Sequence, residues 1–100
     1  LLLFHGWADP LVTPQRTLEY YDAVRARMGG NESTAQFARL FMLPGVDHCG
    51  LQPGPGAKSV DFDPLPALEA WVERNEAPTT LNVRWQMSDG SVRSRDVQAQ

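Results

Sequence analysis

The sequence predicts an α/β fold in the order strand, helix, strand, helix, with a possible hairpin at the end. The indications are two short, continuous apolar runs, two segments with helical spacing of their apolar residues, and loops rich in glycine and proline between them. A continuous apolar run is typical of a strand buried on both faces. Strands that alternate with helices favour a parallel sheet covered by helices.

The first predicted strand is the apolar run at residues 1–4, which ends before His5-Gly6. The loop HGWADP follows it. Thr13 and Pro14 are then a typical N-cap and first-turn pair for a helix that Gly29-Gly30 ends. This helix is amphipathic, with apolar residues at Leu18, Tyr21, Val24 and Met28.

The second half of the chain begins with polar residues 31–36, which we expect to form a turn, and a second strand at residues 37–43. The segments GVDHCG and QPGPGAKS follow as loops. A second helix should begin at Pro64 with Asp61 or Asp63 as its cap, and Pro78 forbids its continuation far past Asn75. Its apolar face is Leu65, Leu68, Trp71 and Val72. The tail predicts two strands about a turn at residues 88–90.

Composition excludes some classes of partner. The 100 residues are 42% hydrophobic, as in a packed globular chain, and carry a net charge of −3, so no basic face is available for nucleic acid. No apolar run approaches the ~20 residues needed to cross a membrane, and the opening run lacks the features of a signal peptide. Because the chain begins within a strand and without methionine, we expect it to be a piece of a larger protein.

The residues most suited to chemistry are Asp9 and His48. Each lies in a loop directly after a predicted strand, and the carboxyl ends of parallel strands meet at one edge of a sheet, where ligands bind. An aspartate beside a histidine fixes its tautomer, so that the other ring nitrogen can take a proton from a serine. The order acid, then histidine is that of the α/β-hydrolases. A single aspartate in a loop is more often a turn former, and a single histidine more often structural.

Other residues fit this chemistry less well. Asp47 is a weaker candidate for the acid because it adjoins His48, and neighbours on a loop rarely point the same way. His5 could form a metal pair with His48, but a third ligand at suitable spacing is not evident. The nucleophile is expected outside the chain, because no serine lies in a G-x-S-x-G elbow; the serines are Ser33, Ser59, Ser88, Ser91 and Ser94.

The single cysteine, Cys49, allows no internal disulfide. It is either a small buried apolar residue or a thiol whose partner lies in another part of the protein. A thiolate nucleophile beside His48 is disfavoured, because neighbours in sequence seldom reach nucleophile–base geometry.

The strings HGWADPLVTPQRTLEYYDAV, FARLFMLPGVDHCG, PGPG and ALEAWVE resemble the C-terminal catalytic segment of the tannase and feruloyl esterase family. The resemblance implies that residues 1–100 are the C-terminal part of an α/β-hydrolase domain, with the nucleophile-bearing part and the lid domain elsewhere. It implies Asp9 as the triad acid, His48 as the base, and a disulfide from Cys49 to a cysteine next to the nucleophilic serine. A secreted or periplasmic location follows, since disulfides persist in oxidising compartments.

The same resemblance implies no cofactor in this segment, although the lid of the family often holds calcium. Two departures stand out: Leu51-Gln52 replaces further glycine after HCG, and the tail lacks the usual segment with cysteine and proline. We therefore predict a serine esterase of small aromatic acid esters, galloyl or feruloyl. The alternatives are another α/β-hydrolase, such as a peptidase or dienelactone-type enzyme, or a hydrolase-like domain without activity. By itself the chain should be inactive and marginally folded, because it needs the remainder of its hydrolase domain.

Overall fold

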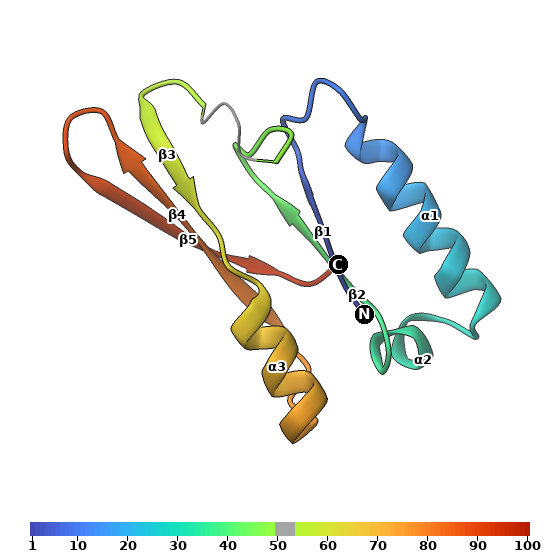
Figure 1. The fold of residues 1–100 in the computed structure, drawn as a ribbon. Helices are drawn as coiled ribbons and strands as arrows, with labels where there is room; N and C mark the ends of the chain where they lie inside the picture. Colours follow the sequence, from blue (N-terminus) through green and yellow to red (C-terminus); the bar gives the residue numbers. More distant parts are fainter. Residues whose placement is uncertain (50–53) are drawn as a thin grey trace.

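The computed structural model describes residues 1–49 and 54–100, and within these it is a mixed helix–strand structure with two sheets (Figure 1). The elements in chain order are β1 (Leu2–Gly6), α1 (Pro14–Arg27), α2 (Asn31–Ala35), β2 (Arg39–Leu43), β3 (Ala57–Asp61), α3 (Leu65–Arg74), β4 (Thr80–Met87) and β5 (Val92–Gln98). No helix among the described residues is both long and apolar enough to cross a membrane.

The strands β1 and β2 form a parallel pair, as the sequence predicted, with Leu2 opposite Arg39 and Gly6 opposite Leu43. The helix α1 makes the crossover between them and lies along one side of the pair (Figure 1). Its start after Thr13 and its end before Gly29 confirm the predicted helix. Because the two strands run parallel, their carboxyl ends lie at the same edge of the sheet.

Strand β2 lies within the second strand predicted at residues 37–43, and it is buried on both faces. Side chains alternate along a strand, so its apolar residues divide between two cores. Leu40 and Met42 pack with Tyr21 of α1 in one cluster. Phe41 and Leu43 face the other way, into the larger cluster, whose remaining buried members are Val46, Leu81, Val83 and Val97.

The second sheet is antiparallel, in the order β3-β4-β5, and it confirms the predicted hairpin about residues 88–90. It also corrects one prediction: residues 57–59, expected to lie in the loop QPGPGAKS, belong to strand β3. This strand pairs with β4, placing Val60 opposite Trp85. The hydrogen bonds of β3 come from β4, which is distant in sequence. The local sequence of β3, which follows a stretch of glycine and proline, therefore does not predict a strand.

Residues 31–35 are a second correction, because they form the short helix α2 and not a simple turn. Gly30 precedes it with φ of 111°, a conformation open to glycine. The Thr34 hydroxyl then donates to the Gly30 carbonyl at 2.8 Å, and Thr34 is fully buried. A single turn of helix is thus held by one buried threonine.

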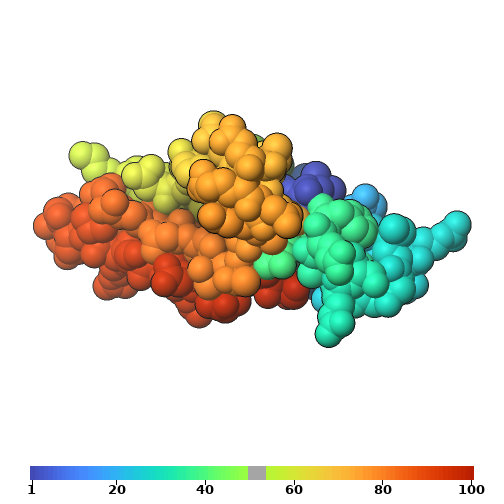
Figure 2. Space-filling model, turned by 90° about the horizontal axis from the view of Figure 1, so that it is seen from below, coloured from blue at the N-terminus to red at the C-terminus, as the bar shows by residue number. Residues whose placement is uncertain are grey.

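Helix α3 begins after Pro64 and ends at Asn75, which adopts the left-handed conformation, as predicted. The N-cap position is Pro64, so neither Asp61 nor Asp63 is the N-cap as predicted; Asp63 instead precedes it and accepts from the Leu65 amide at 3.0 Å. The predicted apolar face is only partly covered, however, since Leu65 is 54% and Val72 78% exposed. Figure 2 shows α3 standing as a ridge on one face, above β4 and β5.

The two sheets join at the end of the chain. Ala99 forms an isolated antiparallel bridge with Phe41, and the Gln100 amide donates to the Leu40 carbonyl at 2.9 Å. The larger core cluster crosses this junction. The hairpin therefore covers one face of β2, while α1 covers the other, and the loops that follow β1 and β2 stay at the free edge.

Candidate active site

The loops after β1 and β2 pack against each other through their backbones. The Trp7 amide donates to the Leu43 carbonyl at 2.9 Å, and the Ala8 amide donates to the Val46 carbonyl at 3.0 Å. Gly6 allows this approach, because a Cβ there would lie 2.1 Å from the Val46 oxygen. The loop after β1 and residues 44–49 after β2 are thus held as one unit at the carboxyl edge of the strands.

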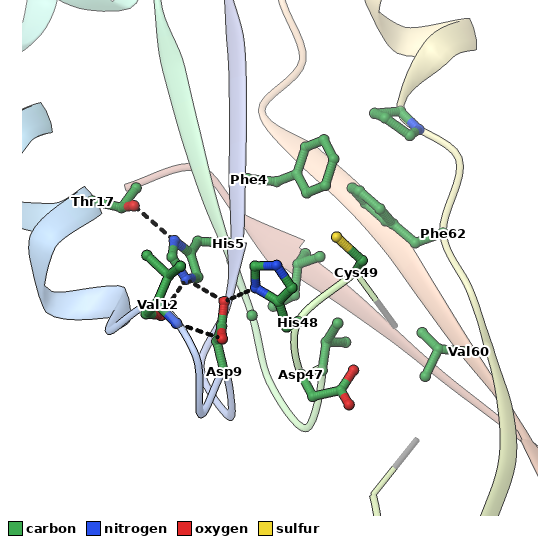
Figure 3. Close-up of a pocket in the computed structure, with 14 residues that line it drawn as sticks. Phe4, His5, Asp9, Val12, Thr17, Asp47, His48, Cys49, Val60 and Phe62 are labelled. Atoms are coloured by element: carbon green, nitrogen blue, oxygen red, sulfur yellow. Dashed lines mark hydrogen bonds and ion pairs between the residues drawn. The ribbon is translucent and has the colours of Figure 1, made fainter. Parts of the chain in front are cut away.

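This packing brings Asp9 and His48 together across 39 positions of sequence. Asp9 Oδ2 and His48 Nδ1 lie 2.8 Å apart (Figure 3). The carboxylate oxygen can only accept, so Nδ1 carries the proton of the neutral ring. Nε2 then carries the free lone pair, so this atom can accept a proton. The sequence predicted that these two residues lie close together, and the structure places them in hydrogen-bond contact.

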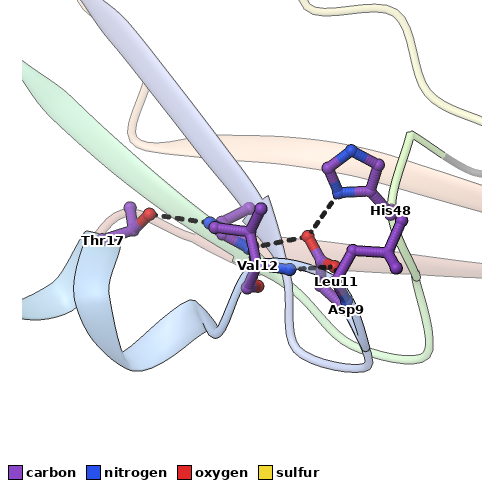
Figure 4. A network of polar contacts seen from close by, with 6 residues as sticks. Asp9, Leu11, Val12, Thr17 and His48 are labelled. Atoms are coloured by element: carbon purple, nitrogen blue, oxygen red, sulfur yellow. Dashed lines mark hydrogen bonds and ion pairs between the residues drawn. The ribbon is translucent and has the colours of Figure 1, made fainter.

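The other oxygen of Asp9 is held by the backbone of its own loop. Oδ1 accepts from the amides of Leu11 at 2.8 Å and Val12 at 2.9 Å (Figure 4). The side chain is only 4% exposed. Burial by itself raises the pKa of this carboxyl, but the Val12 amide, the His48 ring and the Leu11 amide together hold the pKa well below its ordinary value. Asp9 is therefore ionised at neutral pH.

Asp9 and His48 line a cavity of about 630 Å³ between the two loops and the start of α3. Its volume is within the range usual for small-molecule sites. The wall opposite Asp9 is apolar, and its rings of Phe4 and Phe62 meet edge to face with centroids 5.0 Å apart (Figure 3). The His48 side chain is 35% exposed, so a ligand in the cavity can reach it.

The tannase and feruloyl esterase family model matches residues 1–99 of this chain. The chain belongs to that family. A probable feruloyl esterase from Arthroderma benhamiae is 46% identical over 81 residues, which cover 81% of this chain and 15% of the relative. A mono(2-hydroxyethyl) terephthalate hydrolase from Piscinibacter sakaiensis is 41% identical over 90 residues, covering 90% of this chain and 14% of the relative. The chain thus spans about a seventh of the length of these relatives.

Solved structures of the family superpose on nearly the whole chain. An esterase from Aspergillus oryzae matches with a TM-score of 0.79 and 27% identity, over 98% of this chain and 22% of its own. The tannin acyl hydrolase from Aspergillus niger matches with a TM-score of 0.78 and 26% identity, over 98% of this chain and 19% of its own. The described part of this chain therefore adopts a substructure that recurs within larger esterases.

The remaining predicted residues lie around the same cavity. Cys49 is exposed and lines it, with a φ of 59°. Asp47 points away from Asp9 and His48, and its buried Oδ1 has no hydrogen-bond partner among the described atoms (Figure 3). Asp47 is thus not in contact with the histidine. The departure at Leu51-Gln52 lies outside the described residues.

The contact between His5 and Asp9 was not predicted from the sequence. His5, considered only as part of a metal pair, instead contacts Asp9: Nε2 lies 3.0 Å from Asp9 Oδ2. Among residues 1–49 and 54–100, no three His, Cys, Asp or Glu side chains gather as a metal site. The signal available in the sequence was the spacing, because His5 lies only four positions before Asp9.

Proposed function

We propose that this chain supplies the acid and the base of a Ser-Asp-His triad in a carboxylic ester hydrolase of the α/β-hydrolase fold. Asp9 is the acid and His48 the base. The observation that carries the proposal is the 2.8 Å contact from Asp9 Oδ2 to His48 Nδ1 beside a cavity with an apolar wall. It leaves His48 Nε2 free to receive a proton.

We propose that the serine lies in the part of the protein beyond this chain. None of the serines in the sequence lines the cavity beside His48. Strand β1 pairs on one side only among the described residues; Phe4 within the strand is 50% exposed, and Leu1 just before it is 62% exposed. An apolar strand edge of this kind is what a continuing sheet would cover. In this proposal the chain is the C-terminal part of the catalytic domain.

The chemistry would proceed by acyl transfer. His48 Nε2 accepts the proton of the serine hydroxyl as the oxygen attacks the ester carbonyl, and then donates it to the departing alcohol. A water molecule repeats the sequence to release the acid. The ionised Asp9 stabilises the imidazolium each time it forms, which is worth most in a site shielded from water.

The proposed substrates are small esters of aromatic acids, of the galloyl or feruloyl type. The apolar wall formed by Phe4, Val60 and Phe62 suits an aromatic ring. Relatives are named feruloyl esterase, tannase and mono(2-hydroxyethyl) terephthalate hydrolase, and each of these names describes an ester of an aromatic acid. We further propose that Cys49 is disulfide-bonded to a cysteine beside the serine, in a secreted or periplasmic protein.

The test uses the complete protein, meaning the polypeptide in which this chain is joined to the rest of its hydrolase domain. Hydrolysis of methyl gallate and methyl ferulate is measured for the wild type and for His48→Ala, whose kcat should fall at least about a thousandfold. Glu32→Ala, on the surface of α2 and away from the cavity, is the matched control and should leave kcat unchanged. Turnover of neither ester by a folded wild type contradicts the substrate class.

A further inference from the structure

We infer that His5 is a positioning residue that aims the Asp9 carboxylate at His48. This inference rests on the proposed triad. The contact is direct: His5 Nε2 lies 3.0 Å from Asp9 Oδ2, the same oxygen that accepts from His48 Nδ1 (Figure 3). The two histidines therefore hold one oxygen from two directions.

The contacts to Asp9 form a complete set. A carboxylate offers about four lone-pair sites on its two oxygens. Here the amides of Leu11 and Val12 take Oδ1, and the two histidine rings take Oδ2. With both oxygens held, rotation of the carboxylate about its Cβ–Cγ bond breaks hydrogen bonds at each end. His5 is the only one of these four donors that neither belongs to the Asp9 loop nor takes part in proton transfer.

The tautomer of His5 follows from its surroundings. Nε2 faces Asp9 Oδ2 and the Val12 carbonyl oxygen, each at 3.0 Å, and both oxygens can only accept. Nε2 therefore carries a proton. Nδ1 lies 2.7 Å from the Thr17 hydroxyl, which donates to it when the ring is neutral. Since the ring is only 12% exposed and bonded at both nitrogens, it is anchored to α1 and cannot swing away from Asp9.

The loss of this contact has two expected effects. The carboxylate would be free to turn, so His48 would spend less time in the productive orientation, and kcat would fall with little change in KM. The negative charge on Oδ2 would also no longer be shared with His5. It would therefore stabilise the His48 imidazolium more strongly and move the acid limb of kcat/KM to higher pH. The ionisable groups that line the cavity are His5, Asp9, Asp47, His48 and Cys49.

The test compares two amides at this position in the complete protein. In His5→Gln the amide nitrogen reaches nearly the place of Nε2, so it can donate to Asp9; in His5→Asn it reaches only the place of Nδ1. We expect His5→Gln to keep most of kcat and a wild-type acid limb. We expect His5→Asn to lose about tenfold to a hundredfold in kcat, as for a hydrogen bond to a charged group, with its acid limb at higher pH. Thermal unfolding checks that both variants fold.

Equal loss in both amides with an unmoved acid limb would mean that His5 only fills space, and would overturn the inference. So would full activity in His5→Asn. A second measurement separates this inference from the proposed function: the His48 ring is titrated by NMR in each protein, its signals assigned by their loss in His48→Ala. If the wild type hydrolyses no ester, the function fails, yet a raised His48 pKa in His5→Asn alone still supports the positioning role. An unchanged His48 pKa in both amides overturns it.

Discussion

Gly6 lies so close to Val46 that a Cβ on the glycine would be 2.1 Å from the Val46 carbonyl oxygen and 2.7 Å from that of Asp47. Gly6 ends β1, whereas Val46 and Asp47 precede His48 in the loop after β2. The contact is between backbones, so neither side can yield by turning a side chain. The distance between Asp9 and His48 depends on this contact, because it sets how the two loops sit together.

Gly6→Ala should therefore separate the loops. We expect a loss of about 1–3 kcal/mol in the free energy of unfolding, the usual range for overpacking, and a marked fall in kcat. The matched control is Gly54→Ala, where the nearest described atom to a Cβ would be the Gly45 carbonyl oxygen at 3.7 Å. Thermal unfolding and ester hydrolysis of both variants in the complete protein check this. A Gly6→Ala enzyme as stable and active as the control would contradict the argument.

Asp9→Asn tests the acid directly. The amides of Leu11 and Val12 would hold the new carbonyl oxygen, so the NH₂ group would face His48 Nδ1. That arrangement favours the tautomer with the proton on Nε2, which cannot accept from serine. We expect kcat to fall about ten-thousandfold. Asp47→Asn, one residue from His48 but out of contact with it, should cause a far smaller loss; the reverse order of the two variants would make Asp47 the acid.

The low pKa of Asp9 makes a prediction about pH. An ordinary aspartate has a pKa of ~3.9. Because its hydrogen bonds lower the pKa of Asp9, this carboxylate stays ionised at pH values below that one as well as above it. The stability that these bonds contribute is present above that value and is lost only as pH falls through the lower pKa. The acid limb of kcat/KM should thus fit the gain of a single proton, taken up by a group other than Asp9. A limb that requires two protons would show that Asp9 titrates with it.

Cys49→Ser tests the proposed disulfide. If the bond exists, peptides containing Cys49 and a cysteine next to the serine should be recovered joined from a digest under non-reducing conditions. The free energy of unfolding of the variant should be about 2–4 kcal/mol lower than that of the wild type. It should also lose activity, because the bond would hold the serine and histidine loops together. A free Cys49 thiol in the oxidised, active enzyme would rule out the pairing.

The local features of the fold were readable in the sequence. Thr13-Pro14 and Gly29 bound α1, Pro64 and Asn75 bound α3, and Ser88-Asp89-Gly90 turns the hairpin, because capping and turn preferences act over a few residues. What the sequence did not reveal was non-local. Strand β3 pairs with β4, more than twenty residues further along the chain, and α2 carries Thr34, whose burial depends on the surrounding packing.

The candidate site divides in the same way. The sequence by itself predicted Asp9 and His48 as the candidate pair, since each follows a predicted strand and parallel strands end at a common edge. It could not determine that His5 completes the set of donors on Asp9, because this depends on where α1 places Thr17 and on which way each ring faces. Nor could it determine that Asp47 turns away. Those outcomes are set by the packing of two loops across Gly6, a contact between residues far apart in the chain.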